Sequence, residues 1–234
     1  MRKIAITMDI DWAPDFVIYY CLEILEKYQK KATFFATHKS PINELIVSSG
    51  HDLGIHPNFL EGSSHGKSTL EIIEKCLEFA PNANIMRSHA LYSSSPLINN
   101  IFTNFKQLKL DVSLFMHRSK FVHSAVFENH NCRYKRLLYN WGDNQEFYAQ
   151  RYSGENNLFF GDISVYGIHP IHVFLNSTDG SEYKNLKGKY MNQKSLNNLT
   201  KYEIEEFQSN KVGVKDFLIN ILRAKTQSIR LEEI

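Results

Sequence analysis

Over its first 115 residues the chain alternates short apolar runs with amphipathic stretches, and this rhythm constrains the fold more than any other feature. The predicted strands cover residues 3–8, 32–36, 51–56, 85–86 and 110–114. Between them, apolar residues recur at the spacing of a helix, as they do from residue 14 to residue 31. Such alternation favours parallel strands joined by crossover helices, so the sequence predicts an α/β fold.

The rhythm weakens in the second half of the chain. Residues 120–160 read as irregular extended segments, 165–175 as one strand and 176–210 as a polar loop. A last amphipathic helix is predicted over residues 214–222. The sequence has no repeat, no low-complexity tract and no composition shift at a boundary, so we expect one domain over residues 1–234.

Charge and composition narrow the class of protein. A formal net charge of +2 and the absence of a dense basic tract argue against a nucleic-acid partner. No window is apolar for long enough to span a bilayer, and the first residues do not form a signal peptide. The three cysteines are widely spaced, which predicts neither a disulfide framework nor a cysteine metal site. We therefore expect a cytoplasmic protein of unknown oligomeric state.

Lysine and arginine become more frequent over residues 106–136 and 184–201. A solvated surface is the simpler interpretation of these regions. The alternative is contact with a phosphate on a carrier-linked substrate.

Polar residues gather where the predicted strands end. They are Asp9 and Asp11, His56, Arg87 and His89, and His169 and His172. Because the carboxyl ends of parallel strands meet at one edge, these side chains are predicted to converge. Two carboxylates, an arginine and several imidazoles are the ligands and acid–base groups of a metal hydrolase.

The first two acids carry the strongest signal. Asp9 and Asp11 are two residues apart, so in an extended strand both point the same way. Two close carboxylates repel each other unless a cation lies beside them. One then binds the metal while the other remains a base. Asp15, by contrast, is interpreted as a cap of the helix that begins near Pro14.

These segments, taken in order, resemble the polysaccharide deacetylases with a NodB-type domain, which form carbohydrate esterase family 4. The similar segments are "ITMDID", "KATFFAT", "SSGHDLGIHPN", "RSHALYSSS" and "GIHPIH". The resemblance extends over residues 3–175, and it implies a distorted (β/α) barrel of parallel strands ringed by helices. The segment "HPNFLEGSSHG" also resembles a branch of the family associated with surface-polysaccharide gene clusters.

The resemblance implies a role for each matching residue. Asp9 would be the general base, and Arg87 would orient it. Asp11 would be the metal carboxylate, and His56 the first metal histidine. His169 would be the acid that protonates the leaving amine. The implied reaction is metal-dependent hydrolysis of an N-acetyl group on an amino sugar, with zinc as the expected divalent ion.

The chain departs from the family pattern at two places. Ile10 separates acids that are adjacent in the family. Leu60 stands where the second metal histidine is expected, and its side chain cannot bind a metal. We expect His65, in the glycine- and serine-rich segment that follows, to take that place. The alternatives are that His89 does so or that the site has lost its metal.

Two other functions fit parts of this sequence. An Asp-x-Asp phosphatase would explain the acids, but it gives no reason for His56, Arg87 and His169. A non-catalytic carbohydrate-binding protein on a decayed deacetylase fold would explain Leu60, but it needs neither a base nor an acid. We therefore expect a deacetylase with an acylated amino-sugar substrate, such as a surface-polysaccharide precursor.

Overall fold

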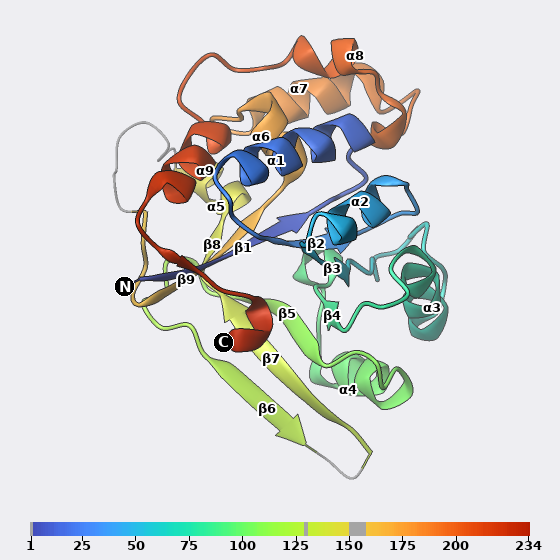
Figure 1. Ribbon diagram of the computed structural model, residues 1–234. Coiled ribbons are helices and arrows are strands. Elements are labelled where there is room, and N and C mark those ends of the chain that lie inside the picture. Colours follow the sequence, from blue (N-terminus) through green and yellow to red (C-terminus); the bar gives the residue numbers. More distant parts are fainter. Residues whose placement is uncertain (1, 129–130, 150–157) are drawn as a thin grey trace.

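The computed structural model describes residues 2–128, 131–149 and 158–234 (Figure 1). The strands are β1 (Lys3–Asp9), β2 (Thr33–Ala36), β3 (Asp52–Ile55), β4 (Ile85–Met86), β5 (Leu110–Phe115), β6 (Ser124–Glu128), β7 (Arg133–Tyr139), β8 (Trp141–Gly142), β9 (Ile163–Ile168) and β10 (Gln227–Ser228). They form one sheet in the order β6-β7-β5-β4-β3-β2-β1-β9-β8, and β10 pairs with β1.

Helices lie between most of the strands. The α-helices are α1 (Asp15–Lys27), α2 (Ile42–Ser48), α3 (Thr69–Phe79), α4 (Ser95–Asn104), α5 (Asp143–Ala149), α6 (Pro170–Leu175), α7 (Ser181–Tyr190), α8 (Lys201–Glu205) and α9 (Val214–Arg223). Short 3₁₀ turns are η1 (His89–Leu91), η3 (Leu196–Asn198) and η4 (Leu231–Glu233). In the described part of the chain, no helix is long and apolar enough to cross a membrane.

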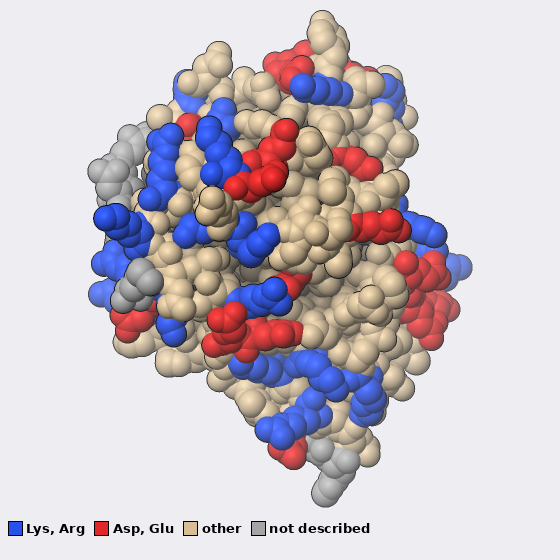
Figure 2. Space-filling model, viewed as in Figure 1, with Lys and Arg blue, Asp and Glu red and all other residues tan. Residues whose placement is uncertain are grey.

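The sheet is parallel except at β6, which pairs antiparallel with β7. It curls into a half-barrel with helices around its outer face (Figure 1). The predicted distorted barrel of parallel strands ringed by helices is therefore confirmed. On the face seen in Figure 2, Lys and Arg side chains alternate with Asp and Glu side chains, and neither sign covers it.

Strand β1 shows how the pattern of the sequence builds two layers. Ile4, Ile6 and Met8 face outward and pack into the cluster that also includes the buried sides of α1, α6 and α9. The alternate residues face the inside of the barrel, where Ala5 joins a second apolar cluster. Because side chains alternate along a strand, Asp9 points to the inside as well. The inner face of the barrel therefore carries the carboxylate of Asp9 at the end of β1.

Asn140 bridges the two ends of the curled sheet. Asn140 lies between β7 and β8, which stand near opposite ends of the strand order. Its side chain is wholly buried, and its amide group donates to the carbonyl oxygens of Ser119 at 2.8 Å and Phe160 at 3.3 Å. Its amide oxygen accepts a hydrogen bond from the backbone N–H of Val165 at 2.8 Å. Asn140 thus satisfies backbone groups that the ladder leaves unpaired.

Two predictions for the second half of the chain are wrong. The strand predicted over residues 165–175 ends at Ile168, and α6 follows because Pro170 suits the first helical turn. The region 176–210 is not one loop, since it contains α7, η3 and α8. Helix α7 is missing from the prediction because only Leu186 on it is buried, so it has no apolar stripe.

The region read as irregular, residues 120–160, holds the β6–β7 ribbon and α5 where it is described. The remainder of that prediction, at residues 129–130 and 150–157, lies outside the described residues. Asp15 does not cap α1, because Pro14 is the N-cap and forms no side-chain cap. Asp15 lies in the first turn and accepts a hydrogen bond from Ser40.

We expect Asn140→Ala to lower the free energy of unfolding by at least about 2 kcal/mol, because it leaves buried backbone groups without partners. Urea unfolding measures the change. The matched control is Asn185→Ala on the exposed side of α7, which is expected to change stability by less than about 0.5 kcal/mol. Equal effects of the two substitutions would contradict this role for Asn140.

Candidate active site

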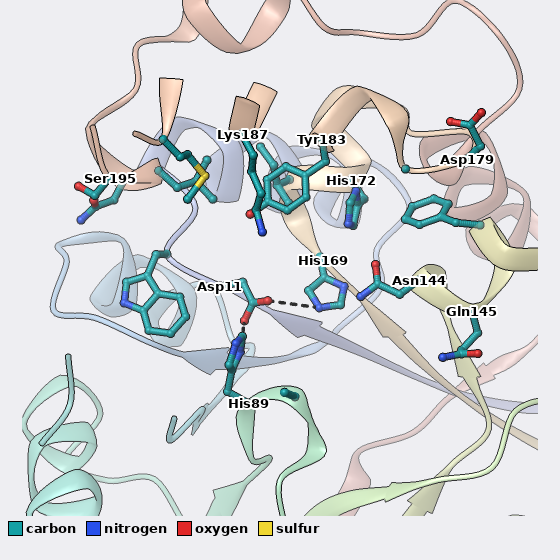
Figure 3. A pocket seen from close by; sticks show the side chains of 18 of the residues that line it. Asp11, His89, Asn144, Gln145, His169, His172, Asp179, Tyr183, Lys187 and Ser195 are labelled. Atoms are coloured by element: carbon teal, nitrogen blue, oxygen red, sulfur yellow. Dashed lines mark hydrogen bonds and ion pairs between the residues drawn. The ribbon is translucent and has the colours of Figure 1, made fainter. Parts of the chain in front are cut away.

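The site is built at the carboxyl ends of parallel strands, as the sequence predicts. Its residues are Asp9 and Asp11 at the end of β1, His56 after β3, Arg87 and His89 after β4, Asp143 after β8 and His169 after β9. Figure 3 shows Asp11, His89 and His169 pointing toward one another from their separate elements. The topology therefore gathers residues that lie up to 160 positions apart, since Asp9 and His169 share one cavity.

Three of these side chains form a group with the geometry of a metal site. Ligand atoms of Asp11, His56 and His89 all lie within 4.8 Å of one another. Asp11 Oδ1 is 3.2 Å from His56 Nε2 and 3.1 Å from His89 Nδ1. Burial alone would raise the pKa of Asp11, but hydrogen bonds with His56 and His89 hold it well below its usual value. A carboxylate and two imidazoles are common ligands of divalent zinc.

The surroundings of His56 fit a metal ligand. Its Nδ1 lies 2.7 Å from the backbone carbonyl oxygen of Arg87, which can only accept a hydrogen bond. Nδ1 therefore carries a proton, and Nε2 is the ring nitrogen that faces Asp11 and His89 and is placed to bind a metal. A second hydrogen bond of this kind fixes the tautomer of histidines that bind metals.

Unusual backbone turns present two of these three residues. Asp11 and Trp12 have φ angles of 46° and 56°, and Ala90 and Leu91, directly after His89, have 52° and 55°. Residues other than glycine rarely adopt this left-handed conformation, and such turns often occur at functional sites. Asp11 therefore reaches the group from a turn beyond β1, rather than from the pleat of the strand on which the sequence argument relied.

Arg87 occupies the interior of the barrel beside Asp9. It is fully buried, and its Nη1 donates to Asp9 Oδ1 at 2.9 Å and to Thr7 Oγ1 at 2.8 Å. The guanidinium carbon lies 4.6 Å from the ring centroid of Phe35 and 4.2 Å from that of Tyr139. These contacts hold the carboxylate of Asp9 in place beside a positive charge.

Gly167 of β9 permits this arrangement. A Cβ atom at Gly167 would lie 2.8 Å from the Tyr139 ring, which is closer than side-chain carbons approach one another. The absence of a side chain at Gly167 therefore allows Tyr139 to lie against Arg87.

His169 is held on the opposite side of the group by Asp143. Its Nδ1 is 2.7 Å from Asp143 Oδ1, and its backbone N–H donates to Asp143 Oδ2 at 2.7 Å. Burial alone would lower the pKa of His169, but the charge and hydrogen bond of Asp143, with Asp11 and Asp9, raise it to about 10. Burial would raise the pKa of Asp143, and the charge of His169 lowers it below its usual value. The raised pKa favours the imidazolium form of His169, and its Nε2 lies 3.5 Å from Asp11 Oδ2.

The sequence argument overlooked Asp143. It follows β8, which has only two residues and lies in a region that shows no strand pattern. The available signal was the pair Gly142-Asp143, an acid after a tryptophan and a glycine, which is too common to identify an active site.

His65 does not lie in this group, whereas His89, the alternative that the sequence left open, does. The Nε2 of His65 is 2.8 Å from the carbonyl oxygen of Thr37, and its Nδ1 accepts a hydrogen bond from the backbone N–H of Asn58. Both ring nitrogens are therefore engaged with backbone, and burial lowers the pKa of the ring. His65 ties the loop after β3 to β2, and its ring lies 5.5 Å from that of Trp12.

His172 supports the site from behind. Its Nδ1 is 3.0 Å from Ser177 Oγ, and burial lowers its pKa to about 4, so the ring is neutral. Its ring packs edge-on against those of Phe147 and Tyr183. These contacts give His172, on α6, a structural role beside the site.

Two connected cavities meet at this group. The inner one has a volume of about 290 Å³ and is lined by Asp9 and His56 among others. The outer one has a volume of about 1150 Å³ and is lined by Trp12, by α7 and by residues 195–197. Asp11, His89 and His169 line both cavities, so the group stands where they join.

Comparison with known proteins agrees with this geometry. A family model described as "WbmS-like: Polysaccharide deacetylase" matches residues 6–187. The chain therefore belongs to the WbmS-like polysaccharide deacetylases. A search of curated proteins found no match.

Solved structures place the fold in the same group. A crystal structure of a Bordetella bronchiseptica protein, WbmS, assigned as a polysaccharide deacetylase of O-antigen biosynthesis, is 27% identical with a TM-score of 0.79, and the match covers 94% of this chain and 89% of that chain. The Xyl-CE4 domain of a xylanase from a Trinervitermes trinervoides hindgut metagenome matches in fold, at 14% identity and a TM-score of 0.50, over 99% and 88% of the two chains.

The same fold also occurs without catalysis. A CE4 family pseudoenzyme from Bacillus anthracis matches at 10% identity and a TM-score of 0.50, over 99% of this chain and 64% of that chain. Fold alone therefore does not establish activity, which depends on the side chains of the site.

We expect His89→Ala to weaken zinc binding more than about 100-fold, since it removes a ligand. His65→Ala is the matched control and is expected to bind zinc as the unchanged chain does. Competition against a chromophoric chelator measures both affinities. Loss of binding in His65→Ala with retention in His89→Ala would contradict the grouping.

Proposed function

We propose that this protein is a metal-dependent deacetylase that hydrolyses the N-acyl group of an amino sugar in the synthesis of a surface polysaccharide. The observation that supports the proposal best is that two neighbouring carboxylates in one cavity have different partners. Asp11 joins His56 and His89, while Asp9 is held apart from them by Arg87. Family membership supports the same reaction class.

The residues of the chain would divide the work as follows. Asp11, His56 and His89 would hold a divalent ion, with zinc as the proposed identity. When bound, such an ion polarises an acyl carbonyl group and acidifies water. Asp9, held in place by Arg87, would take a proton from the attacking water.

His169 would complete the reaction from the other side. An amide nitrogen is a poor leaving group unless it is protonated, and a raised pKa keeps the imidazolium of His169 available for this. The C–N bond breaks as the nitrogen receives the proton of His169, and acetate and an amine are the products. Asp143 would fix the tautomer and orientation of the ring through the hydrogen bond to Nδ1.

The alternatives have less support. Sugar binding without turnover is the second candidate, since a pseudoenzyme of this fold exists. Sugar binding alone does not explain why the Asp9–Arg87 and His169–Asp143 pairs are present. An Asp-x-Asp phosphatase does not account for the family assignment. The cytoplasmic location stays a prediction from the sequence.

We expect Asp9→Asn to lower the rate of acetate release from N-acetylated sugars by about 100- to 10,000-fold, because it removes the general base. The rate is measured with zinc or cobalt supplied, and thermal unfolding checks that the variant folds. Asp162→Asn, an exposed site away from both cavities, is the matched control and is expected to keep full activity. Absence of acetate release by the unchanged chain across a broad panel would contradict the proposal.

We expect Asp143→Asn to lower kcat by about 100-fold and to leave zinc affinity unchanged, because Asp143 holds His169 and is not one of the three residues of the metal group. Steady-state kinetics and zinc titration on the same preparation test both parts. A variant that loses zinc, or that raises only KM, would argue against this positioning role.

A further inference from the structure

Helix α7 forms one wall of the outer cavity, above the group that the proposed reaction uses. Tyr183 and Lys187 are one turn apart on α7 and both line this cavity. Asp11 and His169 line it as well, so a substrate whose acyl group lies between these two would have further atoms under α7. The contacts made by α7 therefore bear on which substrate fits.

Lys187 presents a positive charge to this cavity. Its Nζ lies 4.5 Å from the centroid of the Tyr183 ring, a cation–π contact. The Tyr183 ring itself packs edge-on against His172, at 5.1 Å between centroids. Figure 3 shows Lys187 extending from α7 toward the side of the cavity where Asp11 and His169 lie. The aromatic ring thus steadies the ammonium group at the cavity wall.

This charge has no anionic partner in the part of the chain that the structure describes. Among the described residues, none forms an ion pair or a hydrogen bond with the ammonium group of Lys187. Two other lysines of this region do have such partners, since Lys189 pairs with Glu206 and Lys194 with Glu203, both at 2.5 Å. Asp179 also lines the cavity and lies outside the metal group. It appears at the upper right of Figure 3, and the Lys187 side chain does not point toward it.

We propose that Lys187 binds an anionic group of the substrate, a phosphate or a carboxylate carried by the acylated amino sugar. This inference rests on the proposed function for its choice of ligand class. An ammonium group on a ring, at the edge of a cavity and without a protein counter-ion, is suited to accept charge-assisted hydrogen bonds to such oxygens. An anion-binding role for Lys187 implies that the substrate is an acidic or phosphate-linked sugar rather than a neutral one.

The test uses sugars without an acyl group, so that no turnover occurs. Methyl glucoside, glucose 1-phosphate and glucuronic acid are titrated into the full chain, and binding is followed by NMR. We expect at least one of the two anionic sugars to bind about tenfold more tightly than methyl glucoside. The anion that gains more identifies whether a phosphate or a carboxylate is the natural group.

Three variants assign that gain to Lys187. Lys187→Met is expected to abolish the difference, and Lys187→Arg to keep most of it. Lys184→Met is the matched control, because Lys184 is exposed on the same helix and does not line the cavity, and it is expected to change nothing. The inference is overturned if neither anion binds more tightly than the neutral sugar, or if both methionine variants act alike.

These outcomes are separate from those of the deacetylase test. If no acetate is released but anions still bind at Lys187, the proposed reaction is wrong and the anion site is supported. Acetate release that is equal for neutral and acidic substrates, and that Lys187→Met leaves unchanged, would remove the anion site and leave the reaction.

Discussion

The centre of this structure depends on one buried guanidinium. Arg87 has no exposed surface, and a buried charge is strongly destabilising unless the surrounding protein compensates it. Compensation comes from several strands: Asp9 of β1 and the carbonyl oxygen of Val112 in β5 accept its hydrogen bonds, and the rings of Phe35 in β2 and Tyr139 in β7 cover it. The barrel must therefore close around Arg87 for the charge to be stable there.

The position of Arg87 explains why two carboxylates only two residues apart have different partners. Asp9 belongs to the regular strand and is held by Arg87 inside the barrel. Asp11 lies past the strand end in a left-handed turn, which carries it to His56 and His89. Ile10, between them, is buried in the core on the other side. In the family the two acids are adjacent, whereas here Ile10 lies between them. This spacing allows one acid to contact an arginine while the other contacts two imidazoles.

The sequence predicted the parallel strands and most of the converging residues, because apolar runs and strand ends leave clear local patterns. It failed where a residue's role depends on contacts distant in the chain. His65 follows His56 closely in the sequence, yet the loop turns it toward Thr37, while His89 reaches the group from the neighbouring strand. Asp143 follows a strand too short to recognise, and Lys187 lies on a helix without an apolar stripe.

The most direct test of this account is anomalous X-ray diffraction, at the zinc absorption edge, from crystals of the full chain grown with zinc. The account predicts one strong peak about 2.0–2.2 Å from a carboxylate oxygen of Asp11 and from ring nitrogens of His56 and His89. A strong peak bound to His65 instead, or a junction without any peak in zinc-grown crystals, would contradict it.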